Sequence, residues 1–400
     1  MQTNFDNPII ATDTAQRANE ILRSCVHCGF CNATCPTYLL TGNELDGPRG
    51  RIYLMREYLQ GDSERDRVES HLDRCLTCRA CETTCPSGVQ YAELAEITRA
   101  ELGADRTGVP GRLRKLLAWA VPNAKRLRRL SRLGRLSRPF LTHRLRDLVP
   151  AKVGHSIASV EGFERQVIVL NGCAQQVTTA ETNQHLQDLL ATRGVGTLVV
   201  SDEQCCGSLD LHYGSDAVAL DRMRANVDAL FPLLADVDAI LSTASGCGVT
   251  IKDYERHLSA DPAYADRAAA VCAKVLDVSE YIGALMDEGV EFGPALERRR
   301  VAWHSPCTLT HGQGLTDTVE LVLEAAGYTC VEVRDPHLCC GSAGAYSLFN
   351  PELSSSLRSK KLSSLQQDAP EVIASANVGC QGHLQNGTTT PVVHWVQLLK

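Results

Sequence analysis

Two runs of cysteines near the start of the chain share one spacing. Cys25, Cys28, Cys31 and Cys35 recur fifty residues later as Cys75, Cys78, Cys81 and Cys85, and each run ends in a proline, Pro36 or Pro86. This C-x-x-C-x-x-C-x-x-x-C-P pattern is the one with which bacterial ferredoxins hold [4Fe–4S] clusters. A tight loop presents three thiolates from one side while its backbone N–H groups point at the sulfurs. The fourth iron of each cubane then needs a ligand from elsewhere.

Crossed ligation supplies that fourth ligand in two-cluster ferredoxins, because the last cysteine of each run binds the other cluster. We therefore predict two metal sites, one made of Cys25, Cys28, Cys31 and Cys85, and the other of Cys75, Cys78, Cys81 and Cys35. Paired zinc sites are the alternative interpretation, but zinc requires neither a three-thiol run nor a trailing proline.

A second repeat occupies the rest of the chain and is built around two Cys-Cys-Gly triplets. Its cysteines recur at offsets of 134, 134, 134 and 133 residues: Cys173, Cys205, Cys206 and Cys247, then Cys307, Cys339, Cys340 and Cys380. Equal spacing in both halves favours a cofactor-binding or redox role for these eight thiols over burial as small residues retained after a duplication. The two repeats use sixteen of eighteen cysteines, and we expect the other two, Cys272 and Cys330, in apolar strand-like surroundings of the core.

Four histidines accompany the second set of triplet cysteines: His304, His311, His337 and His383. Loop and core positions are the commoner roles of such residues. Among them His383 is the best candidate ligand, because it lies three residues beyond Cys380.

The elements that must position these cysteines change in character along the chain. Apolar residues at three- and four-residue spacing predict helices in residues 12–24, 48–60, 63–74 and 91–102. Short β-branched runs alternating with helical stretches then predict eight strands. These are residues 165–171, 196–202, 238–244 and 273–279 in one half, and 299–305, 328–334, 371–377 and 391–397 in the other.

The expected fold class is therefore multidomain, with an α-helical ferredoxin domain followed by two similar α/β domains. We expect domain ranges of 1–104, a basic connector at 105–160, then 161–290 and 291–400. In each α/β domain the cysteines follow the first three strands, where the carboxyl ends of parallel strands would gather them. The two α/β domains should face one another.

Composition excludes several classes of protein. A chain of 400 residues with 44% hydrophobic and 22% charged residues is ordinary for a globular protein. It shows neither a signal peptide nor a run of about 18 apolar residues, so we expect a cytoplasmic protein with reduced thiols. No Gly-rich dinucleotide fingerprint or P-loop is present. The sequence thus favours an electron-transfer subunit, without catalytic residues of its own, over a complete dehydrogenase.

One segment concentrates positive charge. Residues 112–146 hold twelve Lys and Arg residues and no acid, although the net charge of the chain is -7. Leu and Trp alternate with these residues at helical spacing, interrupted by Pro122 and Gly134. Such a pattern is typical of a helix that binds a membrane surface or an acidic partner. A solvated connector is the alternative, and nucleic acid is not expected, because no binding module accompanies the charge.

Residues 11–61 and 71–94, which contain both ferredoxin runs, resemble the family of glycolate oxidase iron–sulfur subunits, and with the Cys-Cys-Gly repeats the resemblance covers essentially the whole chain. It implies FAD-binding partner subunits that oxidise glycolate to glyoxylate. It also implies that electrons leave toward a membrane acceptor such as quinone, at the inner face of the cell membrane, where the protein would be peripheral. The wider heterodisulfide-reductase-like family ends each Cys-Cys-Gly unit with C-x-x-C, whereas Thr250 and His383 stand at those last positions here.

Three other functions stay open at this stage. The chain could serve lactate or glycerol-3-phosphate oxidation, because the cysteine spacing does not separate these substrates. It could be a heterodisulfide-reductase-like thiol–disulfide enzyme, although the missing last cysteines argue against that. It could also assemble or sense iron–sulfur clusters. A further iron–sulfur cluster in the Cys-Cys-Gly units likewise stays open.

Overall fold

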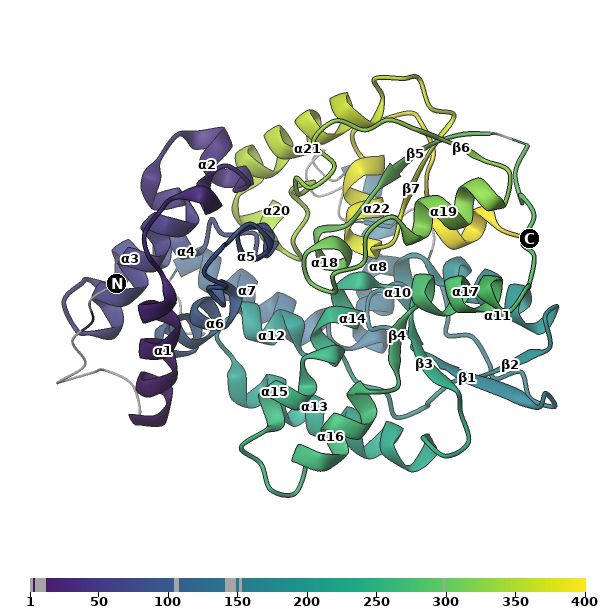
Figure 1. The fold of residues 1–400 in the computed structure, drawn as a ribbon, viewed down its shortest axis with the longest axis horizontal. Coiled ribbons are helices and arrows are strands. Elements are labelled where there is room, and N and C mark those ends of the chain that lie inside the picture. The colour runs from purple at the N-terminus through teal and green to yellow at the C-terminus, as the bar shows by residue number, and fades with distance from the viewer. Residues whose placement is uncertain (1–2, 4–11, 104–107, 141–148, 151–152, 298) are drawn as a thin grey trace.

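The N-terminal part of the chain is a helical unit wrapped around the cysteine loops (Figure 1). The computed structural model describes residues 3, 12–103, 108–140, 149–150, 153–297 and 299–400. The helices of this unit are α1 (Thr12–Ser24), α2 (Pro36–Thr41), α3 (Pro48–Leu59), α4 (Arg65–Leu72), α5 (Ala80–Thr83) and α6 (Tyr91–Leu102), with short 3₁₀ helices η1 (Phe30–Asn32) and η2 (Glu44–Asp46). Pro36 and Pro48 begin α2 and α3, as expected for a residue that has no N–H to donate.

Two helices of the basic segment connect this unit to the rest. These are α7 (Gly108–Ala120) and α8 (Ala124–Ser137), followed by η3 (Arg138–Phe140). Pro122 separates the helices, as the sequence predicts. Gly134 does not interrupt α8, so that expectation is wrong: the flanking leucines and arginines are strong helix formers and outweigh the cost of about 1 kcal/mol for one glycine. Arg144 and Arg146 lie outside the described residues.

Two four-stranded parallel sheets follow, and both have the same topology. The first sheet has the order β2-β1-β3-β4 and the second the order β6-β5-β7-β8. All eight strands fall where the β-branched runs predict them. They are β1 (Arg165–Val169), β2 (Val195–Leu198), β3 (Ala239–Ser242), β4 (Val275–Asp277), β5 (Arg300–His304), β6 (Thr329–Val331), β7 (Val372–Ser375) and β8 (Val392–His394).

Helices cover both sheets and link successive strands. In the first half these are α10 (Gln175–Thr178), α11 (Ala180–Ala191), α12 (Ser208–His212), α13 (Asp216–Leu230), η4 (Phe231–Leu233), α14 (Ser245–Lys252), α15 (Tyr254–Leu258), α16 (Ala265–Cys272) and α17 (Val278–Asp287). In the second half they are α18 (Cys307–Thr310), α19 (Thr318–Ala325), α20 (Tyr346–Phe349), α21 (Pro351–Leu365), α22 (Val378–Gln385) and η5 (Trp395–Leu398). Cys272 therefore ends a helix, not a strand, while Cys330 lies in β6.

The two halves face one another across a shared hydrophobic core. One cluster of buried residues joins β1 and α11 of the first half to β5, α19 and η5 of the second, with Trp395 fully buried in it. Hydrogen bonds cross the same interface: Nε2 of His394 contacts the carbonyl of Thr243 at 2.8 Å, and Oγ of Ser245 contacts Oγ1 of Thr308 at 2.7 Å. The predicted domain boundaries at 104, 160 and 290 stay predictions.

An ion pair and a hydrogen bond hold the helical unit against the two halves. Arg79 pairs with Asp253 of the first half at 2.6 Å, and Nδ2 of Asn350 in the second half donates to the carbonyl of Asp73 at 3.0 Å. Arg114 is buried, pairs with Asp73 at 2.5 Å and lies over the ring of Phe349. One residue of the basic segment is therefore a structural cation and not a surface charge.

The shared core gives the first prediction. Trp395→Ala removes a fully buried indole that both halves contact, so the free energy of unfolding should fall by about 3–5 kcal/mol. Urea denaturation of the full chain, followed by circular dichroism, measures this. Trp119→Ala is the matched control, because that side chain is 50% exposed, and its effect should stay within about 0.5 kcal/mol. Equal effects of the two substitutions would contradict the shared core.

Candidate iron–sulfur sites and the Cys-Cys-Gly thiols

The first four-thiol set lies at one end of the helical unit. Cys25, Cys28, Cys31 and Cys85 line one open pocket of about 420 Å³, together with Cys81 and Pro86 from the second run. The thiol of Cys31 interacts electrostatically with those of Cys25, Cys28 and Cys85. Burial raises the pKa of Cys31 to about 11, and neighbouring thiolates add to this effect. Cys28 is exposed, so this set reaches the protein surface.

The second four-thiol set is buried deeper. Cys35, Cys75, Cys78 and Cys81 line a neighbouring cavity of about 310 Å³. The thiol of Cys81 interacts with those of Cys78, Cys75 and Cys35. The fold thus brings together the two groups that crossed ligation predicts, and the donor sets fit two four-iron clusters. The assignment of each ligand stays a prediction.

Both cysteine loops adopt the same unusual backbone. His27 and Gly29 have φ values of 60° and 85°, and Thr77 and Arg79, fifty residues later, have 50° and 60°. Left-handed backbone at non-glycine residues is costly and persists only where the surroundings enforce it. Here it turns N–H groups toward sulfur, because the N–H of Thr77 donates to Sγ of Cys75 at 3.4 Å and that of His27 interacts with Cys25 in the same way.

Buried cations distinguish the second set from the first. Burial raises the pKa of Cys75, but the guanidinium groups of Arg51 and Arg99 outweigh it, so that this pKa lies below its ordinary value. The hydroxyl of Tyr91 also donates to Sγ of Cys75 at 3.4 Å. Arg51 is 1% exposed and is held by Thr37. The sequence patterns did not identify Arg51 as a residue of the site. Its position among the apolar residues of the predicted 48–60 helix could have indicated that it is buried.

The four thiols of the first Cys-Cys-Gly unit also converge. Sγ of Cys173 lies 3.5 Å from Sγ of Cys205, and Cys206 interacts with both Cys205 and Cys247. Gly207 has a φ of 90°, which explains the glycine after the pair. Beside them, Glu203 accepts hydrogen bonds from the N–H groups of residues 171 and 172, and its burial raises its pKa to about 7.

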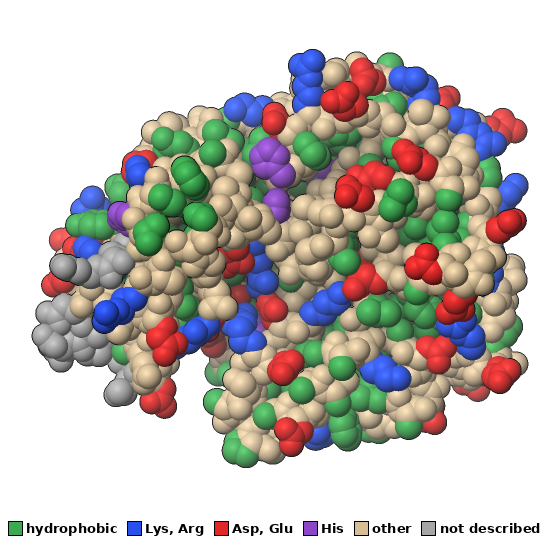
Figure 2. Space-filling model, in the orientation of Figure 1, with side chains coloured by type: hydrophobic (Ala, Val, Ile, Leu, Met, Phe, Trp, Pro, Cys, Tyr) green, Lys and Arg blue, Asp and Glu red, His purple; other side chains and the backbone are tan. Residues whose placement is uncertain are grey.

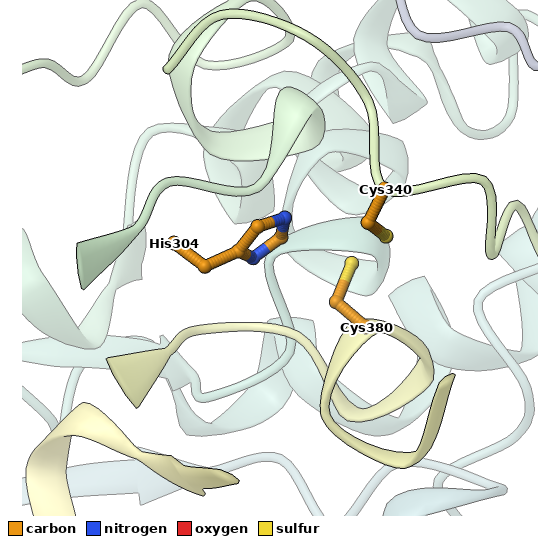
Figure 3. Close-up of side chains that lie close together, drawn as sticks. All are labelled: His304, Cys340 and Cys380. Atoms are coloured by element: carbon orange, nitrogen blue, oxygen red, sulfur yellow. The ribbon is translucent and has the colours of Figure 1, made fainter. Parts of the chain in front are cut away.

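The second Cys-Cys-Gly unit repeats this arrangement of thiols, but the side chains around them differ. Sγ of Cys307 lies 3.9 Å from Sγ of Cys339, and Cys340 interacts with Cys380. His304, at the end of β5, points its ring toward Cys340 and Cys380 (Figure 3). One donor atom from each of these three residues lies within 4.8 Å of the others.

The structure therefore favours His304 over His383 as a neighbour of the thiols. Nε2 of His383 contacts Oγ of Ser354 at 3.3 Å, and burial lowers the pKa of this imidazole to about 4. His311 contacts Thr83 and the carbonyl of His337 instead of sulfur. Sequence spacing pointed to His383, but its helix turns the ring toward α21.

The second ferredoxin set lies against the second Cys-Cys-Gly unit. The thiol of Cys78 interacts with that of Cys307, and Cys339 interacts with Cys78. Cys339 belongs to a small apolar cluster with Leu76 and Tyr346, and both Cys78 and Cys307 pack against that cluster. The structure thus brings the helical unit and the thiols of the second half to the same buried cluster.

Comparisons with known proteins agree with this layout. Residues 21–89 match the model of a 4Fe-4S dicluster domain, and residues 167–252 and 301–385 each match that of a cysteine-rich domain. The chain is 42% identical to the glycolate oxidase iron–sulfur subunit of Escherichia coli over 100% of this chain and 98% of that protein. The chain belongs to the glycolate oxidase iron–sulfur subunit family.

Other relatives also match nearly the whole length of this chain. The probable glycolate oxidase iron–sulfur subunit of Bacillus subtilis is 30% identical over 95% of this chain and 92% of its own. One component of the dihydromethanophenazine:CoB–CoM heterodisulfide reductase of Methanosarcina acetivorans is 24% identical over 92% of this chain and 89% of its own. A hypothetical protein from Helicobacter pylori shares the fold, with a TM-score of 0.56 at 11% identity over 97% of this chain and 72% of its own.

Membership of this family confirms three expectations. The chain is an electron-transfer subunit of an oxidoreductase, it carries iron–sulfur clusters, and a helical ferredoxin domain precedes two cysteine-rich α/β units. Among the residues that the structure describes, no helix has the length and apolar character needed to cross a membrane.

Crossed ligation can be tested by pairing substitutions. Cys28→Ser with Cys85→Ser should cost about four irons per chain, no more than either change alone, because both residues would serve one cluster. Cys28→Ser with Cys35→Ser should cost about eight irons, because the two residues would serve different clusters. Iron and sulfide analysis of anaerobically purified full-length protein decides between them. Uncrossed ligation predicts the reverse pattern for Cys85 and Cys35.

Proposed function

We propose that this chain takes electrons from FAD-binding partner subunits that oxidise glycolate to glyoxylate and delivers them toward a quinone or another membrane acceptor. The observation that supports it most is the full-length similarity to glycolate oxidase iron–sulfur subunits, combined with two convergent four-thiol sets. When bound, each four-iron cluster accepts and releases one electron. The substrate site would lie on a partner subunit.

The positions of the two thiol sets support a direction of electron transfer through the chain, from the first set to the second. The first set opens to the surface at Cys28, beside Val26 and Phe30, which are 67% and 62% exposed. Exposed aromatic and aliphatic side chains around a redox site suit a protein partner. Hydrophobic side chains gather over the helical unit in Figure 2. We therefore assign this end to the contact with a flavoprotein.

We assign the second thiol set to the inner part of the electron-transfer route, next to the α/β units. The thiol of Cys78 interacts electrostatically with that of Cys307 in the second Cys-Cys-Gly unit, and Arg51 and Arg99 stabilise negative charge at Cys75. Fixed buried cations favour the more negative state of a nearby redox group. Thiol–disulfide chemistry of the heterodisulfide reductase kind is the weaker candidate. Thr250 donates to the carbonyl of Gly246, and His383 contacts Ser354, so neither side chain replaces the missing thiol.

A single cysteine tests the proposed function. Cys78→Ser removes a proposed cluster ligand whose thiol interacts electrostatically with that of Cys307, so glycolate-dependent reduction of a quinone analogue by the assembled complex should be abolished. Flavin reduction by glycolate, followed optically, should survive because it precedes this chain. Cys272→Ser, a cysteine outside both repeats, is the control. Wild-type turnover by a Cys78 variant that lacks the cluster signal would refute the route.

We further propose that α8 holds the complex at the inner face of the cell membrane. Leu130, Leu133 and Leu136 are 39%, 61% and 78% exposed, and they lie among exposed basic residues of the same helix. A basic helix with exposed leucines binds anionic lipid through about 1 kcal/mol per basic residue near the surface. Glutamine at Lys125, Arg129, Arg132 and Arg135 should therefore weaken binding to vesicles that contain anionic lipid.

The matched control removes the same number of charges elsewhere. Arg23, Arg67, Arg334 and Lys360 are exposed and lie outside α8, and their replacement by glutamine should leave vesicle binding unchanged. Salt at about 1 M shortens the screening length to about 3 Å and should release the wild-type complex. Equal loss of binding in both variants would assign the effect to net charge, and unchanged binding in both would leave α7 and α8 as a solvated connector.

A further inference from the structure

Two arginines of α3 lie beside the two thiol sets of the helical unit and differ in how their charge is balanced. Arg49 lines the pocket of the first set, where its side chain is 36% exposed and pairs with Glu44 at 2.6 Å. Arg51, two residues further along, lines the cavity of the second set and is 1% exposed. Because a guanidinium group stays charged in a protein, Arg51 brings a positive charge into the interior.

Neutral groups make the hydrogen bonds of the Arg51 side chain. Its Nε donates to the carbonyl of His71 at 2.9 Å, and its Nη1 donates to Oγ1 of Thr37 at 3.1 Å. Among the residues that the structure describes, Nη2 of Arg51 has no hydrogen-bond partner. The buried carboxylate of Asp46 lies 3.9 Å from this nitrogen, but it is closer to His71 and Arg74, at 2.7 and 3.1 Å. Asp46 therefore offsets the charge of Arg51 only in part.

A second buried arginine acts on the same thiols. Arg99 is 5% exposed, and its terminal nitrogens donate to Oγ1 of Thr77 and to the carbonyl of Leu72, at 3.0 and 3.3 Å. Both of these acceptors are neutral. Burial of a cation is costly unless an anion lies nearby. The second thiol set is the anion that the two arginines share, because both guanidinium groups interact electrostatically with Cys75.

The thiols themselves show the sign of this effect. Burial alone would raise the pKa of Cys75, yet the two arginines hold it below its ordinary value. At Cys78 and Cys81, burial and neighbouring thiolates raise the pKa instead. The cations therefore stabilise negative charge on the side of the set that holds Cys75 and Cys35, and Nη1 of Arg51 lies 3.9 Å from Sγ of Cys35.

We propose that Arg51 and Arg99 raise the reduction potential of the cluster held by the second thiol set above that of the first, so that the electron rests next to the α/β units. Reduction adds one negative charge to a group that four thiolates already make anionic, and nearby cations favour that state. The deeper burial of the second set opposes the effect, because burial disfavours added charge. At Cys75 the arginines outweigh burial, and we expect the same balance for the cluster.

This assignment refines the direction of electron transfer proposed above and rests on the two ligand sets, but not on glycolate. An electron that passes between the clusters oxidises the first and reduces the second, and no proton or bond is exchanged. A chemical reductant can therefore replace the partner subunits in the test. The assignment can fail while the proposed function stands, and the reverse also holds.

The experiment titrates the anaerobically purified full chain with dithionite and redox mediators at one pH, followed by electron paramagnetic resonance. The cluster left in Cys28→Ser should have a higher reduction potential than the cluster left in Cys78→Ser. Arg51→Gln should lower the higher of the two wild-type potentials by at least about 59 mV, which is a tenfold change in the equilibrium constant of a one-electron couple. Arg51→Lys, which keeps the charge, should retain most of the wild-type value.

Two further variants separate charge from packing. Asp46→Asn removes a carboxylate that partly balances Arg51, so the higher potential should rise, opposite to the effect of Arg51→Gln. Loosened packing would not move the two variants in opposite directions. Arg49→Gln, on the same helix, is the matched control. It should change the equilibrium constant of the higher couple by no more than about threefold, because the charge of Arg49 is partly exposed and already paired with Glu44.

Three results would overturn the proposal. They are a second cluster whose potential is equal to or below that of the first, an unchanged higher potential in Arg51→Gln, and shifts of the same sign in Arg51→Gln and Asp46→Asn. If iron analysis shows that Arg51→Gln loses the second cluster, Arg99→Gln takes its place. Arg99→Gln should then lower the higher potential while Asp46→Asn raises it, and any other combination refutes the role of the buried arginines.

Discussion

The exchange of one cysteine between two loops constrains the whole N-terminal unit. Cys35 lies with the thiols of the second loop and Cys85 with those of the first, so neither cavity is complete until both loops are in place. The left-handed residues of the loops, the buried Arg51 and the helices between the loops all hold that arrangement. Because Arg79 of the second loop pairs with Asp253, and Asp73 just before that loop accepts a hydrogen bond from Asn350, the same arrangement also helps to place the two α/β units.

The two α/β units share a backbone fold but differ in the charged residues around their thiols. Both sheets have the same strand order, and both put a glycine with a φ of 90° after the cysteine pair. Yet a buried Glu203 lies beside the first thiols, while Lys361 and His304 lie near the second. Since like charge opposes and unlike charge favours a thiolate or a reduced centre, the two units are electrostatically different sites in the same fold.

Patterns local to the chain predicted most of the fold, and contacts between elements account for the rest. The eight strands follow from buried parallel strands being continuous apolar runs, and the convergence of the thiols follows from strand ends meeting at one sheet edge. The preference for His304 over His383 depends on the rotation of α22 and on Ser375 of a neighbouring strand, which no local spacing encodes. The burial of Arg51 and Arg114 likewise depends on residues distant in sequence, Thr37 and Asp73.

The core shared by the two sheets also bears on how the protein is made. Leu186 and Leu190 of α11 pack in the same cluster as Trp395 and Leu398. During synthesis the first sheet is finished at β4, but the part of α11 that packs against η5 stays uncovered until η5 emerges more than a hundred residues later. At about 5–20 residues per second, that exposure lasts roughly 5–20 s on the ribosome, long enough for aggregation to compete with folding and for chaperones to bind.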